Sequence, residues 1–196
     1  MIIQKVPHYV DSVLTQEVAS AALQGGDVVV AWYTNQVNSQ SVVHSHPYYE
    51  LILPVAGSSV RYSVGGSVYD LHLGELILFP GDMYHSCKFN ITADTSERLV
   101  VQIAPGIWDR AWQQSGLPRR AWNRDPIILD ANAVLHWDFR GLLERMAQTV
   151  SLDERIRPLV QCCEVTELIL LASHVIHPAQ RCTAALGHQP ADCQGR

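Results

Sequence analysis

The stretch that decides the fold begins His44-Ser-His46-Pro-Tyr-Tyr-Glu50, and six further residues lead to Gly57. It resumes as Gly74-Glu-Leu-Ile-Leu-Phe-Pro80-Gly-Asp and reaches His85. Side chains alternate between the two faces of a strand, so both histidines of the first half point to one face, and Glu50 shares that face if the strand is unbroken. His85, on the later strand, can complete the group from the opposite wall.

Three imidazoles and one carboxylate form a set of possible metal ligands. This donor set suits first-row transition metals such as iron, nickel, manganese or zinc. The sequence therefore makes His44, His46, Glu50 and His85 candidate ligands of a divalent transition metal. A second interpretation stays open, in which the same side chains hold no metal and instead form hydrogen bonds that line a pocket or tie strands together.

The two halves of the stretch resemble the two-part cupin motif. The first half of that motif, H-x-H-x3-E-x6-G, matches in full from His44 to Gly57. The second half, G-x5-P-x-G-x2-H-x3-N, matches at its first glycine, its proline and its histidine, whereas Asp82 stands at the second glycine position and Phe89 at the asparagine position. The resemblance implies a jelly-roll barrel that encloses a pocket.

The first half of the chain as a whole predicts a β domain. Short segments bounded by turn residues predict strands at residues 27–34, 48–55, 58–64, 67–73, 75–79, 83–89 and 98–104. Gly65-Gly66 predicts a tight hairpin, because glycine tolerates positive φ. These strands place a sandwich or barrel at residues 27–105. Residues 1–26 are expected to form a loose N-terminal arm over it, with a short helix capped by Asp11 as the alternative.

Beyond residue 105 the pattern becomes helical. Trp108 and Trp112 lie four residues apart within residues 106–116, so a helix there places one above the other. We interpret this helix as an apolar plug packed on the barrel, and a lid at the barrel mouth is the alternative. Residues 106–131 are thus a short helix and an irregular connection. Residues 178–196 show no periodicity and are expected to form a disordered tail.

Residues 132–177 predict an antiparallel hairpin of two amphipathic helices. The apolar stripe of the first helix is Leu135, Phe139, Leu142, Met146 and Val150. The stripe of the second is Cys162, Val165, Ile169, Ala172 and Ile176, widened by Leu168, Leu171 and Val175. A stripe this wide must be buried, and a hairpin at the end of a barrel can offer it to a second copy. We therefore expect a homodimer interface at Leu168, Ile169, Ala172 and Ile176.

A barrel followed by two amphipathic helices resembles the sensor and dimerisation half of AraC-type transcription regulators. The resemblance is carried by His-Pro-Tyr-Tyr-Glu-Leu-Ile-Leu-Pro-Val-Ala-Gly, which ends at Gly57, and by Tyr-Asp-Leu-His-Leu-Gly-Glu-Leu-Ile-Leu-Phe-Pro-Gly, which begins at Tyr69. It covers residues 27–177 and implies that the barrel binds a small effector, such as a sugar or related metabolite, and that the helices pair two chains. The family's helix-turn-helix units have no counterpart in residues 178–196, so we expect no direct DNA binding from this chain.

Strand alternation also selects candidate contacts to the effector. Tyr48 shares the parity of the ligands in the first half of the motif and is the first candidate for an aromatic contact. Cys87 and Phe89 share the parity of the histidine in the second half, so both should face the interior, where Cys87 is expected to be a small buried residue. Trp32 and Tyr62 are further candidates, for which a role in the core is the alternative.

Composition limits the remaining possibilities. The chain has 196 residues and a net charge of -5, which provides no basic footprint for nucleic acid. The N-terminus does not resemble a signal peptide, and the late apolar window contains Glu164 and Glu167, which argue against a membrane span. Five cysteines, two of them adjacent, are not the pattern of a disulfide framework, which favours a reducing, cytoplasmic setting.

Two functions of different classes fit these observations. The first is a cytoplasmic sensor domain that takes a small molecule into its barrel and pairs through its C-terminal helices. The second is a metal-dependent cupin enzyme, of the dioxygenase or sugar isomerase type, that uses the two-half ligand set. The helical hairpin favours the sensor over the enzyme, whereas the intact ligand set keeps the enzyme as the alternative.

Overall fold

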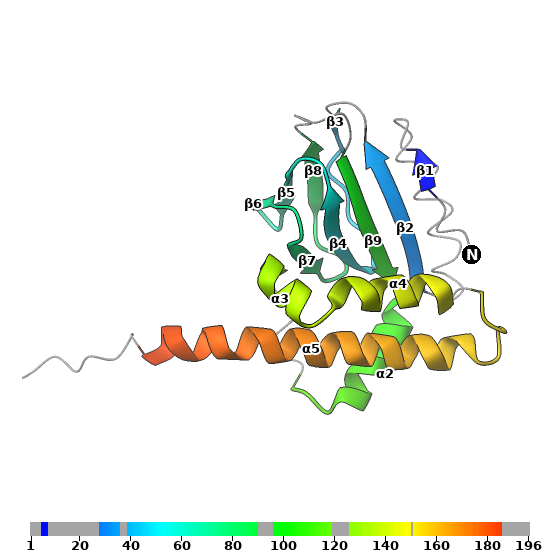
Figure 1. Cartoon of the computed structure of the whole chain (residues 1–196). Helices are drawn as coiled ribbons and strands as arrows, with labels where there is room; N and C mark the ends of the chain where they lie inside the picture. The colour runs from blue at the N-terminus through cyan, green and yellow to red at the C-terminus, as the bar shows by residue number, and fades with distance from the viewer. Residues whose placement is uncertain are drawn as a thin grey trace, which may run out of the picture.

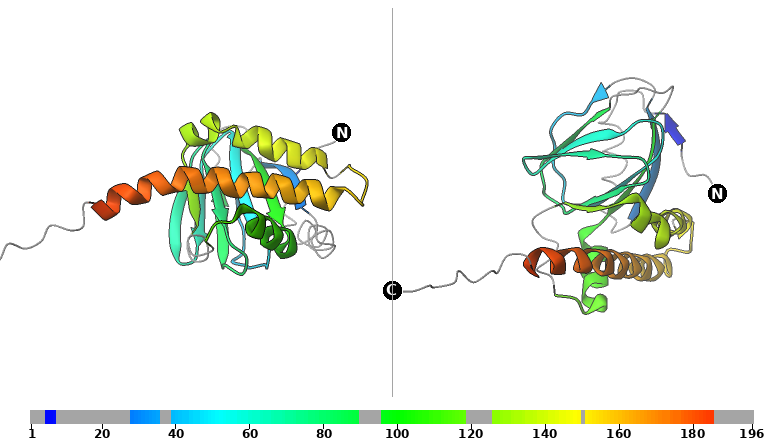
Figure 2. Two further views of the ribbon diagram at one scale, coloured as in Figure 1. Left: turned by 90° about the horizontal axis from the view of Figure 1, so that it is seen from below. Right: turned by 60° about the vertical axis from the view of Figure 1, so that its left-hand side comes forward.

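The computed structural model describes residues 5–7, 28–35, 39–89, 96–118, 126–149 and 151–185. The strands in these residues form two mainly antiparallel sheets that face each other around a shared interior (Figure 1 and Figure 2). The larger sheet has the order β1-β2-β9-β4-β7-β10, with β1 Lys5–Pro7, β2 Val28–Asn35, β9 Ser96–Ile103, β4 Tyr49–Ala56, β7 Leu76–Phe79 and β10 Ile127–Leu129. The smaller sheet has the order β3-β8-β5-β6, with β3 Ser39–Gln40, β8 His85–Phe89, β5 Val60–Val64 and β6 Ser67–Leu71.

This architecture is the predicted cupin-type jelly-roll barrel. All seven predicted strands are present, and they are β2, β4, β5, β6, β7, β8 and β9. The hairpin between β5 and β6 turns at Gly65 and Gly66, whose φ angles of 57° and 87° lie in the left-handed region that glycine favours. The sequence did not predict β3 or β10, because strands of two and three residues leave no detectable period.

The N-terminal arm begins as part of the larger sheet. Its β1 pairs in parallel with β2, with Lys5 opposite Trp32. The alternative helix capped by Asp11 lies outside the described residues.

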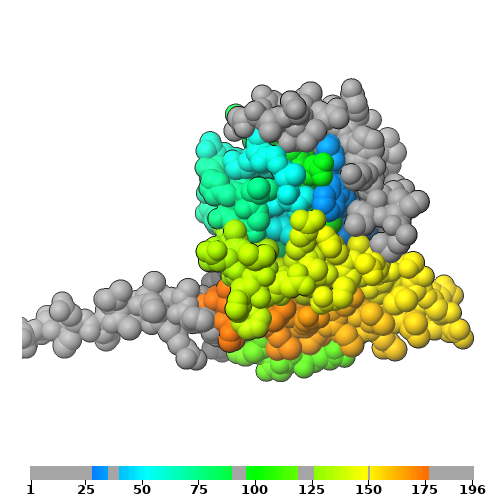
Figure 3. Space-filling view, viewed as in Figure 1, coloured from blue at the N-terminus to red at the C-terminus, as the bar shows by residue number. Residues whose placement is uncertain are grey.

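The helices form a layer under the larger sheet. They are α2 Pro105–Ser115, α3 Ala131–His136, α4 Phe139–Thr149 and α5 Arg157–Ala185. In Figure 3, α5 (orange) lies between the α3–α4 segment (yellow) and α2 (green). Both tryptophans of α2 are buried in this layer, and Trp108 stacks on Tyr49 of β4 with 4.0 Å between ring centroids. The helix therefore packs on the barrel as the predicted apolar plug.

Two apolar cores lie on opposite faces of the larger sheet. Leu99, Val101 and Ile103 of β9 are buried against α2, α4 and α5 in the outer core. Val100, one residue out of phase, faces the barrel interior and belongs to the inner core. Strand alternation thus turns one face of β9 to the helices and the other to the space between the sheets.

The predicted hairpin differs in detail from the observed helices. The chain breaks between α3 and α4 at Asp138, which has a φ of 49°. The Oδ1 atom of Asp138 accepts a hydrogen bond from the backbone N–H of Gly141, and its carbonyl accepts one from Leu142. This capping starts a new helix, and it leaves Leu135 82% exposed, so Leu135 does not belong to the buried stripe.

The second helix of the predicted hairpin, α5, is longer than the sequence predicts. It continues to Ala185, although the disordered tail was expected to begin at residue 178. Residues 186–196 lie outside the described residues. Within α5, Arg157–Ile176 is long and apolar enough to cross a membrane by length and composition, a test that core helices of globular proteins also pass.

The structure places most of the predicted dimer interface inside the chain. Leu168, Ile169 and Ala172 are buried in the outer core, and Ile176 packs against it. The wide stripe of α5 is therefore covered by the sheet, α2 and α4 of the same chain. Three of the four side chains cannot contact a second copy, and the prediction is wrong for them.

Candidate functional site

Three histidines and one glutamate meet inside the barrel. One ring nitrogen from each of His44, His46 and His85 lies within 4.8 Å of the others. The Nε2 atom of His46 lies 2.7 Å from the Oε2 atom of Glu50, and the Nε2 atom of His85 lies 3.9 Å from that oxygen. The four predicted ligands therefore form one cluster, although β4 starts only at Tyr49 and the segment before it is not a continuous strand.

The backbone fixes the histidines relative to each other. His44 and His85 form an isolated antiparallel bridge, with reciprocal N–H to carbonyl hydrogen bonds of 3.0 and 2.9 Å. The carbonyl of His46 accepts a 2.7 Å hydrogen bond from the backbone N–H of Asp82. Asp82 has a φ of 63°, so it adopts the left-handed conformation of the glycine that the cupin motif has at this position.

A close backbone approach supports the same turn. A Cβ atom on Gly81 would lie 2.2 Å from the carbonyl oxygen of Pro47, so only glycine fits without movement of the backbone. The turn between β7 and β8 thus packs directly on the segment that carries the first two histidines.

Two of the histidines have their tautomers set by backbone carbonyls. The Nδ1 atom of His85 donates to the carbonyl of Met83 at 2.8 Å, and Nδ1 of His44 donates to the carbonyl of Val42 at 3.0 Å. In the neutral form each Nε2 atom then carries a lone pair. This is the arrangement that metal-binding histidines commonly use, with one nitrogen held by the protein and the other turned to the ion.

The electrostatics of the cluster centre on Glu50. Burial alone would lower the pKa of His46, but the hydrogen bond and the charge of Glu50 outweigh it, and the pKa of His46 is raised. For Glu50, burial favours the neutral acid, but the hydrogen bond and charge of His46 lower its pKa. Burial lowers the pKa of His85, which favours its neutral form. The hydrogen bond between His46 and Glu50 thus favours the charged forms of both groups, while burial favours the neutral form of His85 beside them.

These residues fit a divalent transition metal. Three imidazoles and a carboxylate are a suitable donor set, and a neutral His85 needs to lose no proton before it binds. The Nε2 atom of His85 is buried and has no hydrogen-bond partner among the described residues. The cluster can therefore hold a metal, with the identity of the metal left open by its chemistry.

Four of the five predicted effector contacts, Tyr48, Tyr62, Cys87 and Phe89, lie in or beside the barrel interior. Tyr48 is buried beside the histidines and stacks on His46, with 5.2 Å between ring centroids. Tyr62 and Phe89 are buried in the inner core, and Cys87 packs against it. Burial raises the pKa of the Cys87 thiol, so it stays protonated as expected for a small core residue. Trp32 does not fit.

Trp32 points away from the barrel interior. It packs against the outer core, and its Nε1 atom donates a 2.9 Å hydrogen bond to Glu97. The strand is apolar on both faces, so the sequence alone did not show which face Trp32 takes. Its neighbour Tyr33 faces the interior instead.

Sequence reasoning missed polar residues of β9 in the interior. Arg98 is only 8% exposed, and its guanidinium lies over the rings of Phe89 and Tyr33, 4.4 and 5.0 Å from their centroids. The Nε2 atom of Gln102 donates a 3.2 Å hydrogen bond to Glu50. The available signal was parity, because Leu99, Val101 and Ile103 give the opposite face of β9 an apolar run that had to belong to the other core.

The chain matches a known family over most of its length. Residues 30–159 match the AraC-like ligand binding domain. The chain belongs to this family. No curated protein sequence matches it.

Solved structures similar to this AraC-like domain include ToxT, a cupin superfamily protein and oxalate decarboxylase. ToxT from Vibrio cholerae, with an unsaturated fatty acid bound, has 9% identity and a TM-score of 0.46, over 68% of this chain and 52% of ToxT. A cupin superfamily protein from Desulfitobacterium hafniense has 10% identity and a TM-score of 0.36, over 40% and 68% of the two chains. Oxalate decarboxylase from Bacillus subtilis, with Mn(II) centres, has 19% identity and a TM-score of 0.35, over 41% and 22%.

The AraC-like domain spans only part of some of these proteins, about half of ToxT and under a quarter of oxalate decarboxylase. The residues that the structure describes include no DNA-binding domain.

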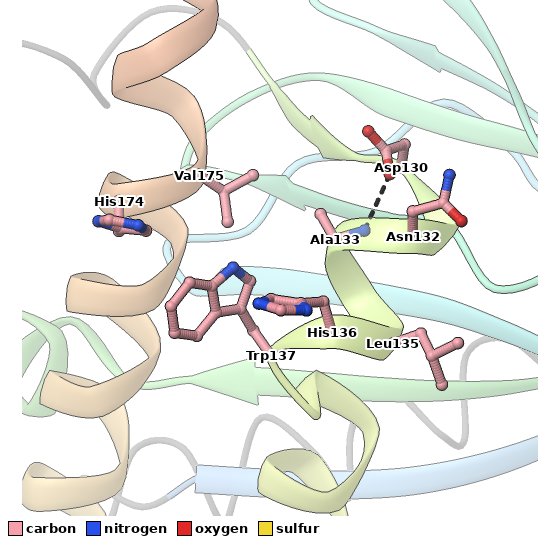
Figure 4. Close-up of a pocket in the computed structure, with 8 residues that line it drawn as sticks. All are labelled: Asp130, Asn132, Ala133, Leu135, His136, Trp137, His174 and Val175. Carbon is pink, nitrogen blue, oxygen red and sulfur yellow. Dashed lines mark hydrogen bonds between the residues drawn. The ribbon is translucent and has the colours of Figure 1, made fainter.

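A concave surface lies outside the AraC-like barrel. It is a groove of about 700 Å³ between α3 and α5 (Figure 4), lined by Asp130, Asn132, Ala133, Leu135, His136, Trp137, His174 and Val175. Trp137 contacts His136 and His174 edge to face, with 5.0 Å between ring centroids in both cases. None of the residues proposed from sequence as metal ligands or effector contacts lies in this groove.

Proposed function

We propose that the chain is the effector-sensing domain of an AraC-type transcription regulator, and that it binds a small metabolite, such as a sugar, inside the barrel. The match to the AraC-like ligand binding domain carries this proposal. Polar groups that face the interior support it, because buried polar atoms without partners need a ligand, water or ion to satisfy them. We place the chain in the cytoplasm and expect it to make no direct contact with DNA, in keeping with its negative net charge.

A ligand screen tests this function. Purified protein in EDTA is heated with a panel of sugars, sugar acids, organic acids and alcohols, and the melting temperature (Tm) is measured. A ligand that binds only the folded state raises Tm with its concentration. A saturable increase for one chemical class is the expected result. A panel that leaves Tm unchanged in every class would contradict sensing.

The proposed dimer uses the exposed face of α5. Leu159 and Leu170 are 67% and 44% exposed, and the exposed Cys163 lies between them. Positions four and eleven residues apart share one face of a helix, so these three residues form a single stripe. Arg145 and Glu167 form an ion pair beside it, with 3.0 Å between Nη2 and Oε1. We propose that a second copy packs on this stripe.

Charge placed on the stripe should separate the dimer. Leu159→Lys combined with Leu170→Lys is expected to yield monomers in size-exclusion chromatography with light scattering, because two buried lysines would face each other across the interface. At high dilution, where wild type is also monomeric, the Tm of the double variant should differ little from that of wild type. Leu135→Lys, on the exposed surface of α3, is the control and should remain dimeric. Dimers of the double variant would refute this interface.

The histidine cluster supports a second candidate, a metal-dependent enzyme of the cupin type. His44, His46, His85 and Glu50 would hold the ion, which would supply Lewis acidity or redox chemistry. Metal analysis of protein purified without chelator tests it. One equivalent of iron, nickel, manganese or zinc, lost in His85→Gln, would favour the enzyme. Sub-stoichiometric metal that is equal in wild type and variant would exclude it.

A further inference from the structure

One amide side chain, that of Gln102, contacts the histidine cluster from a strand that carries none of its four members. Gln102 lies on β9, directly opposite Glu50 on β4. Residues opposite each other on neighbouring strands have their side chains on the same face and close together. The Nε2 atom of Gln102 accordingly donates a 3.2 Å hydrogen bond to the Oε2 atom of Glu50. An ionised carboxylate only accepts hydrogen bonds, so the amide turns its nitrogen, and not its oxygen, to Glu50.

The row of side chains that crosses the larger sheet at Glu50 offers it one hydrogen-bond donor. The row consists of Val29 on β2, Gln102, Glu50 and Phe79 on β7. Phe79 has no polar group, and it lies beside His85 with 4.6 Å between the ring centroids. Of the two residues that flank Glu50 in the sheet, only Gln102 can therefore hold the carboxylate.

The same carboxylate oxygen also contacts two predicted metal ligands. The Nε2 atom of His46 lies 2.7 Å from it, and the Nε2 atom of His85 lies 3.9 Å from it, so the oxygen faces the cluster. A ring nitrogen either carries the proton of a hydrogen bond or presents a lone pair to an ion, and it cannot do both. When Nε2 of His46 binds an ion, Glu50 therefore loses the His46 hydrogen bond and keeps that of Gln102.

The amide thus lies where metal sites have an outer partner. Side chains that bind metals are generally hydrogen-bonded to a further protein group, which orients them and raises the affinity of the site. We propose that Gln102 is a positioning residue of the metal centre, which holds the Glu50 carboxylate toward the three histidines while an ion is bound. This inference rests on the second candidate function, in which the cluster holds a metal, and it adds a residue outside the cluster that sets the affinity.

Cobalt binding tests this role without an assay of activity. The protein is stripped of metal with EDTA, freed of the chelator and titrated with Co²⁺, and visible absorption is followed. Competition with a chelator of known affinity gives the dissociation constant (Kd). Wild type should bind in a saturable way. Gln102→Met, which has a similar shape but no donor, should raise Kd by roughly ten- to hundred-fold. It should also alter the spectrum at saturation, because the carboxylate is no longer held beside the ion.

Two comparisons separate positioning from a general loss of stability. In a Glu50→Gln background, Gln102→Met should have little further effect on Kd, because the carboxylate through which it acts is absent. A double-mutant cycle measures this coupling. Gln40→Met is the matched control, since it makes the same substitution at an exposed position of β3. Its Kd and its spectrum should equal those of wild type.

Each contrary outcome overturns the inference. Unchanged Kd and spectrum in Gln102→Met would refute the role of the amide, while the metal-binding candidate would stand. An equal loss of affinity in both backgrounds would show that Gln102 does not act through Glu50. Wild type that binds no Co²⁺ would overturn the inference together with the metal centre, and the sensing function would still be decided by the ligand screen. If Gln102→Met does not fold, Gln102→Asn, whose amide is one methylene shorter, replaces it, and unchanged Kd in that variant refutes the proposed contact.

Discussion

Replacement of Ile169 by alanine should destabilise the whole domain, not merely loosen one helix. Ile169 is buried in the outer core, which joins α5 to α2, α4 and the larger sheet. The change removes three carbon atoms, which at about 0.8 kcal/mol each amounts to about 2.4 kcal/mol of transfer free energy. Incomplete collapse of the cavity adds to this, so we expect a loss of about 2–5 kcal/mol. Leu135→Ala removes the same number of carbons from an exposed site and should change stability by less than about 0.5 kcal/mol.

Urea unfolding provides the assay for this pair of variants. Far-ultraviolet circular dichroism reports the helices, and fluorescence reports the five tryptophans of the chain, among them the buried Trp108 and Trp112 under the sheet. Both signals should change in one coincident transition, because the outer core couples the helices to the barrel. Equal free energies of unfolding for the two variants would refute the reasoning. So would a separate early loss of helical signal in wild type, which would show that α5 is not part of the core.

Two further predictions concern the histidine cluster. In EDTA, the difference in Tm between wild type and Glu50→Gln should be largest between pH 4.5 and 6.5. The pKa of Glu50 is lowered in the folded state, so its ionisation stabilises the fold fully above its ordinary value of 4.5. The pKa of His46 is raised in the folded state, so its protonation stabilises the fold fully below its ordinary value of 6.5. The difference should shrink as the pH falls below the first value or rises above the second, and a constant difference would contradict the charged pair. Gly81→Ala should cost about 1–3 kcal/mol in urea unfolding, because its Cβ would meet the Pro47 carbonyl, whereas Gly106→Ala, with open space around it, should not destabilise the protein. Equal stability of these two variants would show that the turn does not need glycine.

Much of the barrel could be predicted because the patterns that mark its strands and turns lie within short stretches of the sequence. Turn residues bound each predicted strand, and the Gly65-Gly66 hairpin follows from the one backbone conformation that a two-residue turn requires. The histidine cluster was predicted from spacing, although its first two members do not lie on a regular strand. A bend held by the Asp82 hydrogen bond brings them together, and that contact is between distant parts of the chain.

The errors arise where a choice depends on tertiary contacts. An apolar stripe on α5 predicts burial but does not say by what, and in this chain the burial is intramolecular. Trp32 and Tyr33 are adjacent aromatics on a strand that is buried on both faces, so only the packed structure decides which one enters the barrel. Arg98 was missed because strand parity gives the face on which it lies but not its contacts, and its aromatic partners come from two other strands.

The central claim is that the barrel interior, and not the groove between α3 and α5, binds the effector. Isothermal titration of the strongest ligand from the screen into Tyr62→Phe and Trp137→Ala tests it most directly. Tyr62 is buried in the barrel, and Trp137 lines the groove with 36% of its surface exposed. We predict weaker binding in Tyr62→Phe and unchanged binding in Trp137→Ala. Binding that is lost in Trp137→Ala and unchanged in Tyr62→Phe would contradict the account.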